Sequence, residues 1–173
     1  MGLQETAVLD AAEDLFYERG IQAVGMDEIR GTSGVSLKRL YQLFPSKEAL
    51  VVRYLQRRDK RWRASLMTYV LREGGEVGAV FDWLHQWFSE PGYRGCAFIN
   101  SFGELSATSP AVTAVVRHHK DELWGHLREL VDDDATADQL LLLVEGAIVV
   151  AAIRKDPEVV RHAKAAAEAL VSG

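Results

Sequence analysis

The chain is poor in residues and patterns that several protein classes require. Cys96 is its only cysteine, which rules out an intrachain disulfide and fits a reducing, cytoplasmic setting. Only 4 prolines interrupt the 173 residues. No segment alternates apolar and polar residues between turn signals, so a fold built on strands is not expected. The composition therefore predicts a helical protein of the cytoplasm.

Long apolar runs and targeting signals are also scarce. The N-terminus shows no basic flank followed by an apolar stretch, so we expect no secretory signal. The longest apolar run, Leu140–Ile153, is interrupted by Glu145 and Gly146 and is short for a bilayer crossing. We therefore expect no membrane among the partners.

Motifs for catalysis or metal binding are missing from the sequence. It contains no Ser-His-Asp set, phosphate-binding loop, HExxH or CxxC spacing. His118 and Glu122 stand four residues apart, which permits a shared ion, but this pair alone favours a solvated or core histidine. We predict no catalytic residue, no metal site and no cofactor, and thus a protein that is not an enzyme.

Positive charge is concentrated at one end of an acidic chain, whose net charge is −5. Residues 1–63 carry 11 Lys and Arg against 9 Asp and Glu, a net charge of +2. Residues 64–173 carry 9 against 16, a net charge of −7. This asymmetry indicates two tasks on one chain, with the basic part suited to an anionic partner.

Helical periodicity dominates the sequence. Val8, Leu9, Ala12 and Phe16 belong to one apolar stripe of a first helix, and Gly20 is expected to end it in a left-handed conformation. Start and stop signals along the chain predict about nine helices in an all-α fold. The helices after the first are expected at 26–33, 37–44, 47–71, 77–89, 96–106, 110–131, 136–155 and 157–171.

The segment from Met26 to Phe44 has the chemistry of a helix-turn-helix. Two short helices that cross steeply need a turn residue that tolerates positive φ, and Gly34 meets this need. Val35 can fill the angle between the helices. Ser36 can accept a hydrogen bond from the free N–H groups that open the second helix.

The second helix of this segment is predicted to read DNA. Helical spacing buries Leu40 together with Ile29 and directs the residues around Leu40 outward, toward a major groove. Arginine and lysine suit guanine, glutamine suits adenine, and an apolar side chain suits the thymine methyl group. The predicted base contacts are Leu37, Lys38, Arg39 and Gln42.

Residues 5–55 resemble the DNA-binding end of the TetR family of transcriptional regulators. The resemblance rests on spacing as well as residue type, because the first helix, the turn and the string that follows the second short helix all agree. The matching strings are Gly34-Val35-Ser36, Leu40-Tyr41 and Phe44-Pro45-Ser46-Lys47-Glu48-Ala49-Leu50.

The resemblance implies two domains and further DNA contacts. Residues 1–46 would form a three-helix DNA-binding domain, and residues 47–173 a helical ligand-binding and dimerisation domain joined through a connecting helix at 47–71. Tyr41 and Lys47 would contact phosphates, and a helix N-terminus at Lys47 already favours an anion. The predicted DNA-binding residues are Ser36, Leu37, Lys38, Arg39, Tyr41, Gln42 and Lys47.

The family resemblance also implies a small-molecule effector. Apolar pockets with a few polar groups are the usual small-molecule sites, and aromatic residues are frequent between residues 62 and 124. Asn100 and Glu104 share one helix face, where they could orient a ligand or pair with neighbouring helices. Each aromatic side chain could instead simply fill the core. The predicted ligand-binding residues are Trp62, Leu66, Trp83, Trp87, Phe98, Asn100, Phe102, Glu104 and Trp124.

Residues 136–171 are predicted to form a homodimer interface. Leu140–Ile153 is apolar almost all round and must be buried on nearly every side. Val159–Val171 carries an apolar stripe. Two helices from each chain would make a four-helix interface, although both could instead complete the core of a single chain.

Together these features predict a ligand-responsive transcription regulator. We expect a repressor that binds a pseudo-palindromic operator on double-stranded DNA as a dimer. A small, largely apolar molecule would release it by shifting the connecting helix. An activator, a helical enzyme and an adaptor that kept the fold without DNA binding remain open alternatives.

Overall fold

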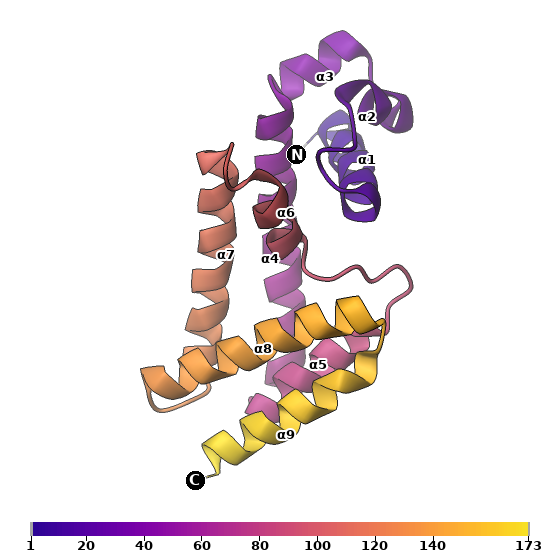
Figure 1. Ribbon diagram of the computed structural model, residues 1–173. Coiled ribbons are helices and arrows are strands. Elements are labelled where there is room, and N and C mark those ends of the chain that lie inside the picture. Colours follow the sequence, from indigo (N-terminus) through magenta and orange to yellow (C-terminus); the bar gives the residue numbers. More distant parts are fainter. Residues whose placement is uncertain (1, 173) are drawn as a thin grey trace. The chain divides into compact units, whose positions relative to one another are not determined.

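The computed structural model describes residues 2–172, and over that range the chain forms helices and no strand (Figure 1). The prediction of an all-α fold with about nine helices is confirmed. The elements are α1 (Leu3–Arg19), α2 (Met26–Ser33), α3 (Leu37–Leu43), α4 (Lys47–Arg72), α5 (Val77–Phe88), α6 (Ala97–Leu105), α7 (Pro110–Arg128), α8 (Asp134–Arg154), the 3-10 turn η1 (Pro157–Val159) and α9 (Val160–Val171).

Several helices begin where the sequence supplies a capping side chain. The Ser36 hydroxyl accepts a hydrogen bond from the Arg39 N–H at 3.3 Å and opens α3. The Ser109 hydroxyl accepts from the Val112 N–H at 3.1 Å at the start of α7. Asp133 opens α8 by accepting from the Thr136 N–H at 2.9 Å. These caps satisfy N–H groups that have no partner within their own helix.

Two helix ends differ most from the prediction, by three residues each. α7 stops three residues early, because the N–H groups of Leu130 and Val131 bond to carbonyls three rather than four residues back. The last helix opens with the 3-10 turn Pro157–Val159 before α9 begins. There the Asp156 carboxylate accepts from the Glu158 N–H at 3.0 Å, a short reach that tightens the turn.

Gly20 ends α1 as predicted, but in a different conformation. Its φ of 86° is positive while its ψ of 152° is extended, so the expectation of a left-handed helical residue is wrong. This region of φ and ψ is accessible essentially to glycine alone. The Gly20 N–H still bonds to the Phe16 carbonyl at 3.0 Å and completes the last turn of α1.

The helices pack as two compact units. Unit 1 combines the chain up to Asp59 with Ala97–Arg117, and unit 2 combines Lys60–Cys96 with the chain from His118 onward. α4 and α7 each run from one unit into the other. The two domains predicted from the sequence, 1–46 and 47–173, do not coincide with these two units. A functional boundary after residue 46 stays a prediction.

Unit 1 is built on the apolar stripe of α1. Leu9, Ala12 and Phe16 are buried there, and the Phe16 ring lies 5.7 Å from the Tyr54 ring of α4, centroid to centroid. Arg57 of α4 also reaches back to α1. The first half of α4 is thus held on α1 by both apolar and ionic contacts.

Unit 2 packs α5 against α8 and α9. α8 is long and apolar enough to cross a membrane by length and composition, yet only 33% of that stretch is buried. Glu145, which interrupts its apolar run, forms an ion pair with Lys120 of α7 at 2.7 Å. Much of α8 therefore remains open on a single chain.

Candidate functional site

The turn between α2 and α3 has the geometry that a helix-turn-helix requires. Gly34 adopts the left-handed conformation, with φ of 69° and ψ of 7°. Val35 is buried, as are Ile29 of α2 and Leu40 of α3. A left-handed residue other than glycine would be strained, so Gly34 allows the sharp change of direction and Val35 fills the angle.

The exposed side of α3 carries the side chains that the sequence assigns to DNA. Leu37 is 45% exposed and Tyr41 is 46% exposed. Buried Leu40 faces the interior of unit 1. The other outward residues of this surface are Ser36, Lys38, Arg39 and Gln42.

Arg39 is held by a residue that the sequence analysis missed. Its Nε–H donates to Oε1 of Gln4, near the start of α1, at 2.9 Å. This contact leaves the terminal nitrogens of the guanidinium available for a bidentate acceptor such as guanine. Gln4 lies 35 residues upstream, and no local signal connects the two.

Lys47 is the first residue of α4 and is only partly exposed. Burial lowers the pKa of its ammonium group below the ordinary lysine value, while the Glu104 carboxylate opposes that change. The Ser46 hydroxyl accepts from the Ala49 N–H at 3.1 Å. The positive side chain therefore stands at a capped helix N-terminus, where an anion is favoured.

Two basic residues of α4 serve packing within unit 1. Arg57 contacts Asp10 at 2.8 Å and Glu13 at 2.9 Å, and Arg58 contacts Glu13 at 2.8 Å. The Arg58 guanidinium also lies 4.3 Å from the centre of the Tyr17 ring. These ion pairs clamp α4 onto α1, so the charges of Arg57 and Arg58 are already balanced.

The predicted ligand-binding residues are divided between the two units. Phe98, Asn100, Phe102 and Glu104 belong to unit 1, whereas the others belong to unit 2. Phe102 is 47% exposed, so its expected place in an aromatic interior is wrong. Spacing on α6 puts Phe98 and Phe102 on one side of the helix, but Phe98 alone reaches the core.

Glu104 and Trp124 are engaged in hydrogen bonds. The Glu104 carboxylate accepts from backbone N–H groups between α1 and α2. The cavity that Asn100 and Glu104 line together in unit 1 is about 10 Å³ and holds at most one water molecule. Trp124 donates from Nε1 to Asp138 Oδ1 at 2.8 Å. Of the two roles left open for Glu104, the structure shows pairing within the protein.

Trp62 is the centre of an aromatic cluster in unit 2. Its ring centroid lies 5.0 Å from Trp83, 5.4 Å from Trp87 and 5.3 Å from His119. Trp83 Nε1 donates to Ser65 Oγ at 3.2 Å. Trp62 Nε1 is buried and has no hydrogen-bond partner among the described residues. A buried donor without an acceptor is unfavourable by about 1–3 kcal/mol.

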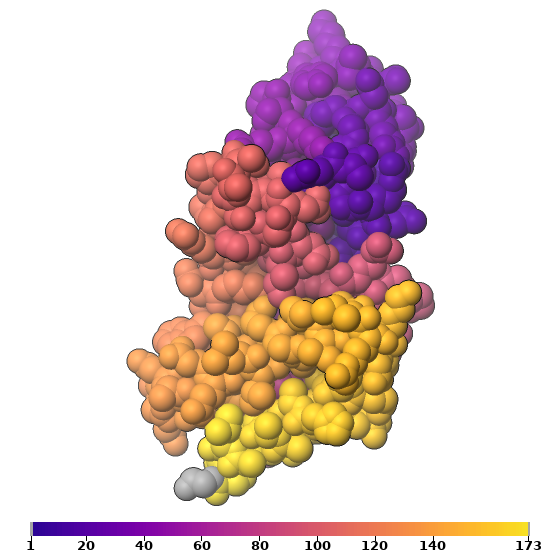
Figure 2. Space-filling view, in the orientation of Figure 1, coloured from indigo at the N-terminus to yellow at the C-terminus, as the bar shows by residue number. Residues whose placement is uncertain are grey.

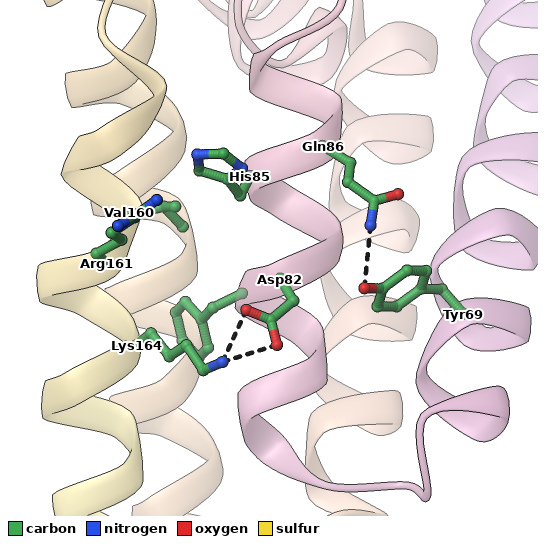
Figure 3. Close-up of a pocket in the computed structure, with 8 residues that line it drawn as sticks. Tyr69, Asp82, His85, Gln86, Val160, Arg161 and Lys164 are labelled. Atoms are coloured by element: carbon green, nitrogen blue, oxygen red, sulfur yellow. Dashed lines mark hydrogen bonds and ion pairs between the residues drawn. The ribbon is translucent and has the colours of Figure 1, made fainter.

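Unit 2 also contains a groove of about 560 Å³ that the sequence analysis did not anticipate (Figure 3). Lys164 contacts both oxygens of Asp82 at 2.7 Å, and Gln86 Nε2 donates to the Tyr69 hydroxyl at 3.0 Å. These four lining residues thus pair with one another, while His85 and Arg161 each lie 2.7 Å from a carboxylate oxygen of Glu158. The lining residues are Tyr69 of α4, Phe81, Asp82, His85 and Gln86 of α5, and Val160, Arg161 and Lys164 of α9.

α8 and α9 expose apolar side chains along residues 142–171 of unit 2. The two helices form the orange and yellow surface in Figure 2. Leu142 is 72% exposed, and the next exposed positions of α8 recur at helical spacing. The exposed large apolar residues of this surface are Leu142, Val149, Val150, Ile153, Leu170 and Val171.

Comparison with known proteins points to one family. The family model described as bacterial regulatory proteins of the tetR family matches residues 8–54. A solved structure of a TetR-family transcriptional regulator from Streptomyces coelicolor has a TM-score of 0.87 and 28% sequence identity. That match covers 99% of this chain and 89% of the other.

Two curated relatives are also similar in sequence. The HTH-type transcriptional activator FasR of Mycolicibacterium smegmatis is 33% identical over 135 residues, which cover 74% of this chain and 58% of FasR. An uncharacterised HTH-type transcriptional regulator of Mycobacterium tuberculosis is 40% identical over 63 residues, which cover 36% of this chain and 31% of the relative. The chain thus spans less than two thirds of either relative, and both are regulators rather than enzymes.

Proposed function

Because the chain belongs to the TetR family of bacterial regulatory proteins, we propose that it is a ligand-responsive transcriptional repressor. It binds a pseudo-palindromic operator as a homodimer, and a small, largely apolar molecule releases it. The observation that carries this proposal is the exposed side of α3, where Leu37 and Tyr41 stand open beside Lys38, Arg39 and Gln42.

The proposed DNA contacts are of two kinds: contacts to base edges, which read the sequence, and contacts to phosphates, which hold the protein on the DNA. Arg39 and Lys38 donate to guanine, Gln42 pairs with adenine, and Leu37 packs on a thymine methyl group. Tyr41, Ser36 and Lys47 bind phosphates, for which the N-terminus of α4 is suited. The acidic charge of residues 64–173 does not oppose this role, since the basic residues lie in the part of the chain that contains α3.

Selection from a random DNA library, followed by binding at fixed salt, tests the proposal. We expect Arg39→Ala to lose discrimination at one base pair, by about 1–3 kcal/mol. Lys47→Ala should weaken binding to all sequences alike and reduce the salt dependence by about one phosphate contact. If neither variant loses affinity for the selected sequence, α3 is not the reading helix and the proposal fails.

The dimer forms through the exposed apolar surface of α8 and α9 in residues 136–171. A surface with Leu142 and Ile153 this open is unusual for a monomer and is typical of an interface. Paired with its copy, it gives a four-helix interface with twofold symmetry. Such a dimer presents its two α3 helices to half-sites about one DNA turn apart, roughly 34–36 Å.

The effector binds in unit 2 against Trp62, Trp83 and Trp87. The buried Trp62 N–H has no acceptor, so a molecule with a carbonyl or similar oxygen on an apolar body would accept its hydrogen bond. Trp62→Phe keeps an aromatic ring and removes the donor. Among aromatic carbonyl compounds that release the wild type from its operator, we expect at least a tenfold weaker effect on this variant. A full response of Trp62→Phe would assign the effector to another site, for which the groove in Figure 3 is the candidate.

A role as activator is the second candidate, because the relative FasR is a transcriptional activator by name. Both roles use the same DNA-binding surface, so binding data do not separate them. A reporter gene placed behind the selected operator does: repression lowers its expression in the presence of the protein, and activation raises it.

A further inference from the structure

Glu104, near the end of α6, holds the connection between α1 and α2 in unit 1. Its Oε1 accepts from the Ile21 N–H at 3.0 Å, and its Oε2 accepts from the Gln22 N–H at 2.7 Å. Its main-chain carbonyl accepts from Gln22 Nε2 at 2.5 Å. One residue of α6 thus makes three hydrogen bonds to two adjacent residues more than 80 positions away.

The connection is shaped to receive this carboxylate. A Cβ atom on Gly20 would lie 3.2 Å from Glu104 Oε1, and Gly20 also has a φ of 86°. The positive φ favours glycine here, and a Cβ atom would also push the Glu104 carboxylate back by a few tenths of an ångström. The same conformation turns the next two N–H groups toward one acceptor group, as backbone anion sites do.

Glu104 also acts on Lys47, the residue that we propose contacts a phosphate. The Glu104 carboxylate acts on the Lys47 ammonium and opposes the effect of burial on its pKa. α2 follows the connection after Gly25 and packs against both α1 and α3. Glu104 therefore contacts the entry to the helix-turn-helix and acts electrostatically on the residue that opens α4.

We propose that Glu104 is a positioning residue for DNA recognition, which fixes the α1–α2 connection and with it the helices that carry the reading surface. This inference rests on the proposed function. Hydrogen bonds to a carboxylate are stronger than those between neutral groups, so their loss frees the connection. A binding surface that must be ordered upon contact binds its target more weakly than one already in place.

Operator binding by the full-length protein tests the role of Glu104. We expect Glu104→Ala to weaken binding to the selected operator about tenfold, and binding to random DNA of the same length less than threefold. Glu104→Gln keeps one acceptor oxygen and should give a smaller loss. Exposed Glu18 of α1 provides the matched control, and Glu18→Ala should bind like the wild type.

Hydrogen exchange supplies a readout that does not depend on DNA. In Glu104→Ala the amides of Ile21 and Gln22 should exchange faster, while buried amides of α8 keep their wild-type rates. Unchanged exchange and unchanged operator affinity in Glu104→Ala would overturn the inference. So would an equal loss for operator and random DNA, because that result indicates a general loss of structure. If the wild type prefers no DNA sequence, the proposed function fails on its own, and exchange at the two amides still shows whether Glu104 holds the connection.

Discussion

The helix-turn-helix and the effector region differ in how far apart along the chain their residues lie. All of α2, its turn and α3 lie between Met26 and Leu43. The predicted effector residues extend from Trp62 to Trp124 and fall into both units. A short segment is organised by its own turn, cap and periodicity, whereas a cavity arises only after distant helices have packed.

The two regions also differ in how their polar groups are used. On α3, Lys38 and Gln42 are exposed and stand ready for a partner. In the groove of unit 2, Asp82 and Lys164 bind each other, as do Tyr69 and Gln86. An interface for a large anionic partner needs open charges, while a small-molecule site is defined by the few groups left without partners, such as Trp62 Nε1.

The largest expected effect is on stability, and it distinguishes the side of α3 that packs in the core from the side that contacts DNA. Leu40→Ala removes a fully buried side chain and should lower the free energy of unfolding by about 2–5 kcal/mol. Leu37→Ala, three residues earlier, removes an exposed side chain and should change stability by less than about 0.5 kcal/mol while weakening operator binding. Urea denaturation and a DNA-binding titration on both variants check this. Equal loss of stability would mean that α3 has no distinct reading side.

The sequence predicts the helix-turn-helix more fully than the sensor region for a physical reason. Gly34 and Ser36 act through bonds within a few residues, so their roles follow from local rules. Gln4 beside Arg39 and Glu104 beside Gln22 meet only through the tertiary fold. Apolar spacing correctly predicts which helices exist, yet it does not tell a core aromatic from the exposed Phe102.

The second effect concerns the exposed leucines of unit 2. Leu142 of α8 and Leu71 of α4 are 72% and 71% exposed. If α8 forms the dimer interface, Leu142→Arg buries a charge there and should weaken dimerisation at least about 100-fold, or roughly 2.7 kcal/mol. Leu71→Arg is the matched control and should leave the dimer intact. Sedimentation over a concentration series measures both, and dissociation by the Leu71 variant alone would move the interface to α4.

The third effect is the change in stability when each of two glycines of the helix-turn-helix is replaced by alanine. Gly34 has positive φ, so Gly34→Ala should destabilise the protein by about 1 kcal/mol. Gly31 lies inside α2, and a Cβ there meets nothing within 4 Å. Gly31→Ala should therefore stabilise the protein by about 0.5–1 kcal/mol. Thermal or urea unfolding measures whether each variant is less or more stable than the wild type. A stabilising Gly34→Ala would contradict a left-handed turn residue at this position.

The smallest effect tests the ion pair that lines the groove. Lys164→Met removes the contact with Asp82 and should lower the free energy of unfolding by about 0.2–1 kcal/mol at pH 7, since the pair is partly exposed. The hydrogen bond to Asp82 raises the pKa of Lys164 above the ordinary lysine value. A group whose pKa is raised by folding contributes fully below its unfolded value, about 10.4 for lysine, and loses that contribution as the pH rises through the folded value.

The difference in stability between the wild type and Lys164→Met should therefore stay constant from about pH 6 to 9 and shrink above about pH 10.4. Urea denaturation at each pH measures this difference. Exposed Lys60 supplies a control with the same chemical change, and Lys60→Met should alter stability by less than about 0.5 kcal/mol at pH 7. A loss in Lys164→Met that is undiminished at pH 11 would assign the contribution of Lys164 to the packing of its methylene groups in the groove, because an uncharged lysine makes the same apolar contacts but no ion pair.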